Sequence, residues 1–89
     1  MKANKPKRLA EKLLQIRLSL GLSQGELIRG LGVEDATTPS YISEYETGQS
    51  EPPLLILLRY ARVAGVSVDV LIDDELDLPV KLPAHPPKR

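Results

Sequence analysis

The chain has 89 residues, a length that fits one small domain. Its 12 basic and 12 acidic side chains balance, which argues against a strongly basic protein that binds nucleic acid regardless of sequence. Cysteine is absent, which excludes a disulfide framework and a thiolate metal site. The sequence contains neither an apolar run long enough to span a bilayer nor a signal-peptide pattern, so we expect a soluble cytoplasmic protein.

Residues 8–20 have the periodicity of an amphipathic helix. Four apolar residues recur at intervals of four, three and four, which places them on one face: Leu9, Leu13, Ile16 and Leu20. Gly21 follows, and glycine commonly ends a helix. We therefore predict a first helix over 8–20, preceded by a flexible basic arm over 1–7.

Two short helices joined by a turn are predicted next. The first begins after Ser23, an N-cap residue with Glu26 as the other half of a capping box, and ends at a glycine. The second begins after Thr38, with Pro39 at a position where a missing N–H costs nothing, and ends at Gly48. Two short helices with such a turn form a helix-turn-helix, whose second helix can lie in a DNA major groove.

A fourth helix is predicted over 53–64, and a short fifth helix begins at Ser67. One apolar stripe of the fourth helix fits a core face: Leu54, Leu57, Leu58 and Ala61. Leu55 and Ile56 fall outside that stripe, and Val70 in the fifth helix adds to the same surface. A helix that is apolar on two faces is buried on two faces, so this surface either meets another subunit or is covered within the domain.

The tail, residues 73–89, divides into two parts. Its first part alternates with a period of two, as expected of an extended arm with one apolar side: Leu76, Leu78, Val80 and Leu82. Pro79 limits this arm to an edge strand at best, and the arm either wraps its own domain or crosses to a partner. Residues 83–89, which include the only histidine, His85, have the composition of a disordered or polyproline II segment.

Catalytic and metal-binding patterns are weak in this chain. Asp73, Asp74, Glu75 and Asp77 are clustered, but they lack the glycine and the spacing of a calcium loop. We interpret them as a solvated acidic surface. No nucleophile–base pair is visible with one histidine in the tail, so we predict no enzymatic activity, no cofactor and no metal.

Three motifs together resemble the Cro/repressor-type helix-turn-helix domain, also called the xenobiotic-response-element-like domain, of bacterial and phage transcription regulators. They are LGLSQGELIRGLGV, ISEYETG and PPLLILLRYARVAGVSVDVL, and they cover about Leu9 to Ile72. The resemblance implies an all-α, five-helix repressor-like domain over 8–72, with an extended C-terminal arm. It also implies a structural ion pair between Arg17 and Glu46.

The sequence departs from the family pattern in the turn. Eight residues separate Val33 from Ile42, where the family has about four. The second helix of the motif has its own start signal and should still form. Its placement relative to the helix before it is left open by the lengthened turn over 33–37.

The resemblance also implies a set of DNA-contacting residues. Gln24 corresponds to a glutamine that anchors a phosphate beside a helix N-terminus. The outward positions that match the base-reading sites are Pro39, Ser40, Tyr41 and Glu44. Thr47, Gly48, Gln49 and Ser50 follow the helix and can offer backbone N–H groups to phosphate, and Thr47 and Ser50 can also offer hydroxyl groups. For each of these side chains the alternative is ordinary solvated surface.

Charge is distributed unevenly along the chain. Residues 1–32 contain seven Lys and Arg against two acids, whereas residues 33–58 contain five acids and no base. We therefore expect the N-terminal segment to be the surface that faces phosphate. The arm over 1–7 is either a disordered terminus or a basic arm that contacts DNA phosphates. Lys12 and Arg29 are either phosphate contacts or solvated charges.

The sequence thus predicts a sequence-specific DNA-binding transcriptional regulator that binds a twofold operator as a homodimer through residues 38–48. Two copies are needed because one small neutral domain makes few phosphate contacts. The predicted dimer interface is Leu55, Ile56, Val70, Leu76, Leu78 and Val80. The alternative is a protein-interaction module on the same fold, an antitoxin-like or adaptor protein with a protein partner and weak or no DNA binding. Zero net charge, Glu44, the acidic turn and the apolar fourth helix favour that alternative.

Overall fold

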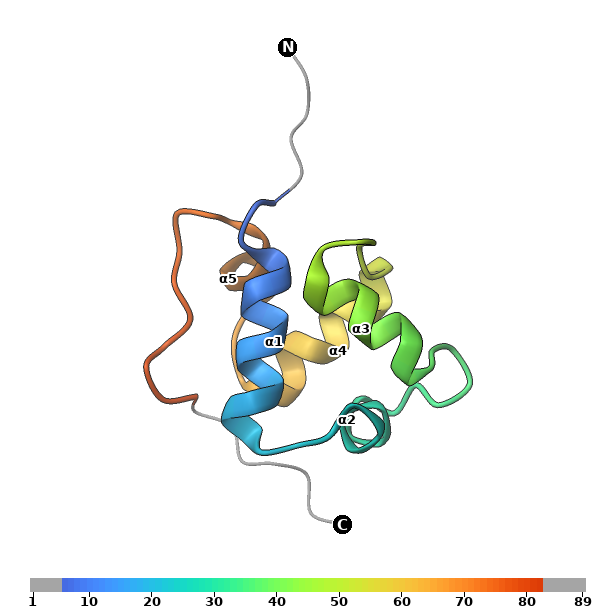
Figure 1. The fold of residues 1–89 in the computed structure, drawn as a ribbon. Coiled ribbons are helices and arrows are strands. Elements are labelled where there is room, and N and C mark those ends of the chain that lie inside the picture. The colour runs from blue at the N-terminus through green and yellow to red at the C-terminus, as the bar shows by residue number, and fades with distance from the viewer. Residues whose placement is uncertain (1–5, 83–89) are drawn as a thin grey trace.

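Residues 6–82 are described by the structure, a computed structural model, and they form five helices and no strand (Figure 1). The helices are α1 (Leu9–Leu20), α2 (Gln24–Leu31), α3 (Pro39–Thr47), α4 (Leu54–Ala64) and α5 (Val68–Ile72). The predicted all-α fold is therefore confirmed. Most of the predicted basic arm, residues 1–5, and the end of the tail with His85 lie outside the described residues.

Local capping signals fix the ends of α2 and α3. The Ser23 hydroxyl accepts a hydrogen bond from the Glu26 N–H at 3.1 Å, and the Glu26 carboxylate accepts one from the Ser23 N–H at 2.8 Å. The Ser23 N–H also lowers the pKa of Glu26. Thr38 caps α3 by accepting from the Tyr41 N–H. Both predicted N-caps are confirmed, as is the capping box.

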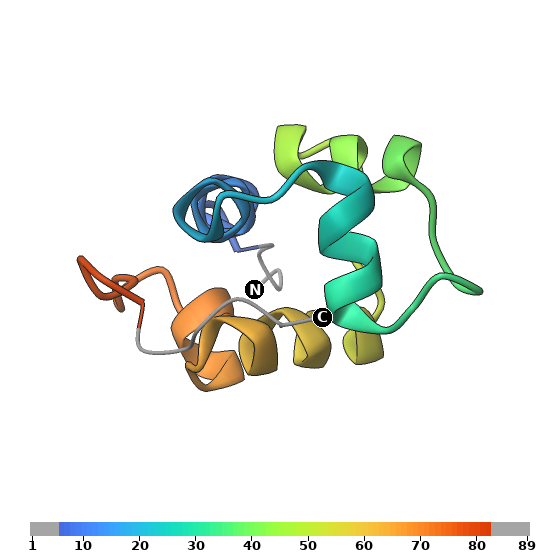
Figure 2. The ribbon, with the colours of Figure 1, turned by 90° about the horizontal axis from the view of Figure 1, so that it is seen from below.

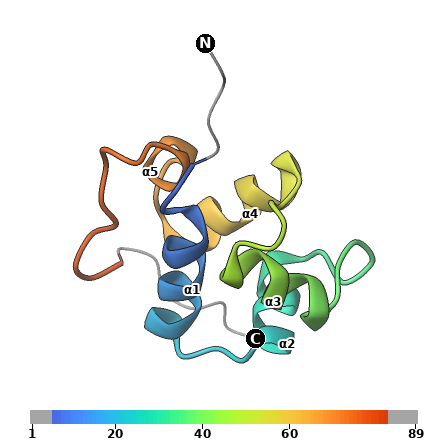
Figure 3. The same cartoon turned by 45° about the horizontal axis from the view of Figure 1, so that its top comes forward.

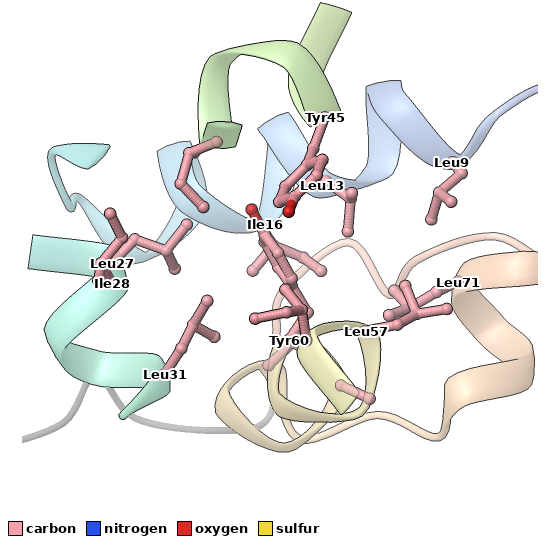
Figure 4. Close-up of a cluster of buried hydrophobic side chains, with 14 of the residues drawn as sticks. Leu9, Leu13, Ile16, Leu27, Ile28, Leu31, Tyr45, Leu57, Tyr60 and Leu71 are labelled. Carbon is pink, nitrogen blue, oxygen red and sulfur yellow. The ribbon is translucent and has the colours of Figure 1, made fainter. Parts of the chain in front are cut away.

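The helices are arranged around one apolar core. Figure 2 shows α1 and α3 on one side of the domain and α4 and α5 on the other, with α2 running between the two sides. Tyr45 from α3 and Tyr60 from α4 enter the core from opposite sides (Figure 4). The largest fully buried side chains come from every helix and are Tyr60, Leu13, Ile16, Leu27, Ile42 and Leu71.

The core face predicted for α4 was partly wrong: Leu57 and Ala61 are buried as expected, but the buried face is turned about the helix axis relative to the predicted one. Its buried residues are Ile56, Leu57, Tyr60, Ala61 and Ala64. Ile56 is only 4% exposed and belongs to the core of its own domain, so it is not available to a dimer interface. Leu54, which was expected inside, is 83% exposed, and Leu55 beside it is 73% exposed. The outward apolar surface therefore lies at the first turn of α4.

The first part of the tail, residues 73–82, forms a strap beside α1 (Figure 1). Lys12 holds it: the side chain is buried, and its ammonium donates to the carbonyls of Val70 at 2.7 Å, Asp73 at 3.0 Å and Leu76 at 2.7 Å. Both predicted alternatives for Lys12, a phosphate contact and a solvated charge, were wrong. The ammonium instead supplies donors to carbonyls at the C-terminal end of α5 and in the strap.

A second set of contacts joins the strap to the start of α1. The Asp74 carboxylate accepts from the backbone N–H groups of Lys7, at 2.9 and 3.0 Å, and Arg8, at 3.0 Å. Arg8 forms a salt bridge with Asp77 at 2.7 Å. The Arg8 side chain makes no cap bond to α1, and Asp74 instead binds the backbone N–H groups of Arg8 and the residue before it, which ties the start of α1 to the strap. The acidic cluster is thus not only a solvated surface.

The alternation of apolar and polar residues in the sequence predicted a strap with one apolar side. The structure does not bear this out. Leu78 and Leu82 are partly buried against the core of their own domain, whereas Val80 is fully exposed. Leu78 is therefore in large part committed to its own domain rather than to a dimer interface. Residues 77–82 have no helical or strand assignment, so the arm wraps its own domain without forming an edge strand.

The hydrogen bonds that Asp74 accepts make stability depend on pH. The N–H groups of Lys7 and Arg8 lower the pKa of Asp74 in the folded state. A carboxyl whose folded pKa is lowered stabilises the fold above its unfolded pKa of about 3.9 and loses that contribution as pH falls through its folded pKa. We expect Asp74→Asn to lower the free energy of unfolding at pH 7 and to change it much less at pH 2.5. Urea unfolding followed by circular dichroism measures both, with Glu75→Gln as the matched control; an equal loss at both pH values would contradict the assignment.

Candidate nucleic-acid interface

The turn between α2 and α3 is a loop with its own hydrogen bonds. The Val33 carbonyl accepts from the N–H groups of Ala36 at 2.9 Å and Thr37 at 3.2 Å. Thr37 is buried, whereas Glu34 and Asp35 are exposed. Figure 3 shows the loop projecting beyond α2 and α3. The additional residues are thus accommodated outside the helices, and α2 and α3 still pack against each other.

An ion pair ties α3 to α1, as the resemblance implied. Arg17 Nε lies 2.7 Å from Glu46 Oε2, and Arg17 Nη2 lies 3.0 Å from Glu46 Oε1. The Glu46 side chain is only 5% exposed, and the hydrogen bond to Glu46 raises the pKa of Arg17. Arg17 also donates to the Leu22 carbonyl at 3.0 Å, in the segment that leads into α2. The pair therefore links α1, α2 and α3 at one point.

Gln24 stands at the first position of α2, close to this pair. Its side-chain amide donates to Glu46 Oε1 at 3.4 Å, and the side chain is partly exposed. The N-terminal end of α2 is thereby held beside α3. The phosphate contact expected of Gln24 stays a prediction, and in this structure the amide donates to Glu46.

The outward face of α3 carries the predicted reading positions. Pro39, Ser40, Tyr41 and Thr47 are exposed, and Glu44 is partly exposed. The inward residues of the helix, Ile42 and Tyr45, are buried. One face of α3 is therefore free to contact a ligand. Tyr41, which is 51% exposed, is its largest exposed side chain.

Three of the side chains predicted to contact DNA are already engaged within the chain. The Glu44 carboxylate accepts from the Ser50 hydroxyl at 3.0 Å, and the Glu44 carbonyl accepts from the Gln49 N–H at 2.9 Å. The Thr47 hydroxyl donates toward the Ser43 carbonyl at 3.0 Å. These bonds order the end of α3, and they reduce what Glu44, Thr47 and Ser50 can offer to DNA.

Sequence reasoning missed one residue on this face. Ser43 is exposed on α3, and its hydroxyl makes no hydrogen bond within the described part of the chain. It lies three residues after Ser40 and four before Thr47, so helical spacing places all three on one side. The spacing was available in the sequence, but the family motif does not draw attention to this position.

The expectation that the N-terminal segment faces phosphate stays a prediction, but three of its bases are engaged within the chain. Arg8, Lys12 and Arg17 donate to acceptors of their own domain. Arg29 on α2 is exposed, and so are Lys7 and Arg62. The net positive charge of this segment therefore overstates the number of bases that DNA can reach.

The fold and this face define an all-α domain with a helix-turn-helix whose second helix is exposed. A family model described as helix-turn-helix, of the Cro/C1 type, matches residues 13–71, which is more than half of the chain. The chain belongs to this helix-turn-helix family of DNA-binding regulators. A search of curated proteins finds no match. None of the described helices is sufficiently long and apolar to cross a membrane.

Proposed function

We propose that the protein is a sequence-specific transcriptional regulator that binds a twofold operator as a homodimer, with α3 in the major groove. The observation that carries this proposal is the exposed face of α3 beside the N-terminus of α2, with Gln24 and Arg17 both bound to Glu46. A rigid link of this kind holds base-reading and phosphate-binding groups in one fixed arrangement. Fixed geometry is needed for sequence discrimination, because phosphate contacts set the register in which bases are read.

Dimerisation is part of the proposal because a single domain offers few free bases. The exposed leucines at the first turn of α4, Leu54 and Leu55, are suitable for the interface, together with Val70, Leu76 and Val80, which are at least partly exposed. Two copies on a twofold site combine half-sites about one helical turn apart, which multiplies a weak half-site affinity. We expect Leu55, rather than the buried Ile56, to contribute most.

The first test is the affinity of the full chain for DNA from upstream of its own gene, compared with a scrambled duplex, over a range of salt concentrations. We expect preference for the native sequence and a steep loss of affinity with salt, because phosphate contacts release counterions. Gln24→Ala should weaken binding about tenfold, since a hydrogen bond to a charged group contributes about 1.5–3 kcal/mol. Gln15→Ala, an exposed change on α1, is the matched control.

Analytical ultracentrifugation of the same samples tests the dimer. The expected species at micromolar concentration is a homodimer, and two protomers should bind one duplex. Leu55→Asp should weaken binding to the twofold site more than binding to a single half-site. Equal, salt-insensitive binding to both duplexes would contradict the proposal and would instead favour a protein partner at the α4 leucines.

A further inference from the structure

The reading face of α3 has an unusual set of side chains. Between residues 39 and 47 it contains no Lys, Arg, Asn, Gln or His. Guanine is usually read by a bidentate Arg or Lys, and adenine by a bidentate Asn or Gln. This helix therefore lacks the groups that make the commonest specific hydrogen bonds to purines.

The remaining hydrogen-bonding groups of α3 are few. The Glu44 carboxylate, which could accept from cytosine, already accepts from Ser50. The Thr47 hydroxyl is directed to the backbone of its own helix, within 3.3 Å of the Glu44 carbonyl as well as that of Ser43. The two nearby glutamines lie outside the helix: Gln24 is bound to Glu46, and Gln49 follows the C-cap.

The apolar part of this face is the more prominent part. Tyr41 lies in the first turn of α3 with half of its surface exposed, and Pro39 in the same turn is also exposed. The first turn of a recognition helix is the part that contacts base edges. The only apolar group that a base pair displays in the major groove is the C5-methyl group of thymine.

We propose that α3 reads thymine C5-methyl groups, with Tyr41 as the specificity-determining contact. The inference rests on the proposed function and names the bases that the site recognises. Ser40 and Ser43 add single hydroxyl groups, which can bond to several base types and discriminate weakly among them. The preferred half-site should therefore contain thymine at one or two positions facing the first turn of α3.

The experiment begins by selecting duplexes that the full chain enriches from a randomised library. In the strongest duplex, each thymine is then replaced singly by deoxyuridine, which removes the C5-methyl group and keeps the base pairing. We expect about fourfold weaker binding for each contacted methyl group, the equivalent of about 0.8 kcal/mol. Thymines in the flanks serve as the control positions.

The role of Tyr41 is tested on the same pair of duplexes. Tyr41→Phe should keep the difference between thymine and deoxyuridine, because the ring is retained, whereas Tyr41→Ser should abolish it. Gln15→Ala, on the exposed surface of α1, should keep the full difference. Selective binding with equal affinity for thymine and deoxyuridine at every position would overturn this inference and leave the proposed function standing. The inference would also be overturned if the full difference in affinity between thymine and deoxyuridine persisted in Tyr41→Ser. Failure to enrich any sequence would overturn both this inference and the proposed function.

Discussion

Glu46→Gln is expected to lower the free energy of unfolding by about 3–5 kcal/mol, because it removes one partner of a buried ion pair and leaves the other charge uncompensated. The carboxylate is almost fully buried and accepts from both Nε and Nη2 of Arg17. A neutral amide of the same size presents an NH₂ group to the guanidinium in place of one oxygen. Small domains are stable by about 5–15 kcal/mol, so this single change removes a large part of the total.

The double variant Arg17→Met/Glu46→Leu distinguishes two contributions to the lost stability: the loss of the ion pair itself, and the cost of leaving the Arg17 charge buried without a partner. Replacing both members of a buried pair by apolar residues is often close to neutral, so we expect the double variant to recover most of the stability lost in Glu46→Gln. Urea unfolding followed by far-ultraviolet circular dichroism is the measurement, since the chain has no tryptophan. A loss below about 1 kcal/mol in Glu46→Gln would mean that the pair behaves like an exposed surface salt bridge.

The ends of the helices could be predicted because their signals are local. Ser23 with Glu26, and Thr38 with Pro39, specify helix starts within four residues of sequence. The Arg17–Glu46 pair spans a longer distance, and it was found only because the chain resembles a family in which those positions are paired. Neither periodicity nor composition indicates that these two charges meet.

The face of α4 could not be predicted because its first five residues, from Leu54 to Leu58, are all apolar. A run of this kind fits several helical stripes equally well. The buried stripe is decided further along the helix, by Tyr60, Ala61 and Ala64. The stripe that was predicted stopped at Ala61 and left out Tyr60, a large side chain that is completely buried.

The sequence predicted which residues of α3 are exposed, but not which of their polar groups are already bonded within the chain. The exposure of Ser40 and Tyr41 follows from helical spacing once Ile42 and Tyr45 are placed inside. The hydrogen bond between Glu44 and Ser50 depends on how the chain turns after Gly48, and no local rule specifies that geometry. Pairings of this kind decide which side chains remain free to bind DNA.

Lys12→Met is expected to lower the free energy of unfolding by about 2–4 kcal/mol, although the sequence offers no sign that Lys12 differs from Arg29. The ammonium of Lys12 serves three carbonyls, of Val70, Asp73 and Leu76. A hydrogen bond to a charged group contributes about 1.5–3 kcal/mol net of the bonds it replaces with water, and the cost of burying the ammonium offsets part of the sum of the three. Methionine keeps the length and apolar packing of the side chain but supplies no donor. The three carbonyls then need water at a place where only 2% of Lys12 is exposed.

Arg29→Met is the matched control, since Arg29 lies on the exposed surface of α2. It should change stability by no more than about 0.5 kcal/mol, as surface substitutions usually do. If Arg29 contacts a phosphate, the same variant should reduce DNA affinity and the slope of its salt dependence by about one counterion. Unfolding in urea and DNA binding at several salt concentrations measure the two quantities separately. A stable Lys12→Met protein with weakened DNA binding would reverse the assignment, because it would place the Lys12 ammonium on DNA rather than on the strap.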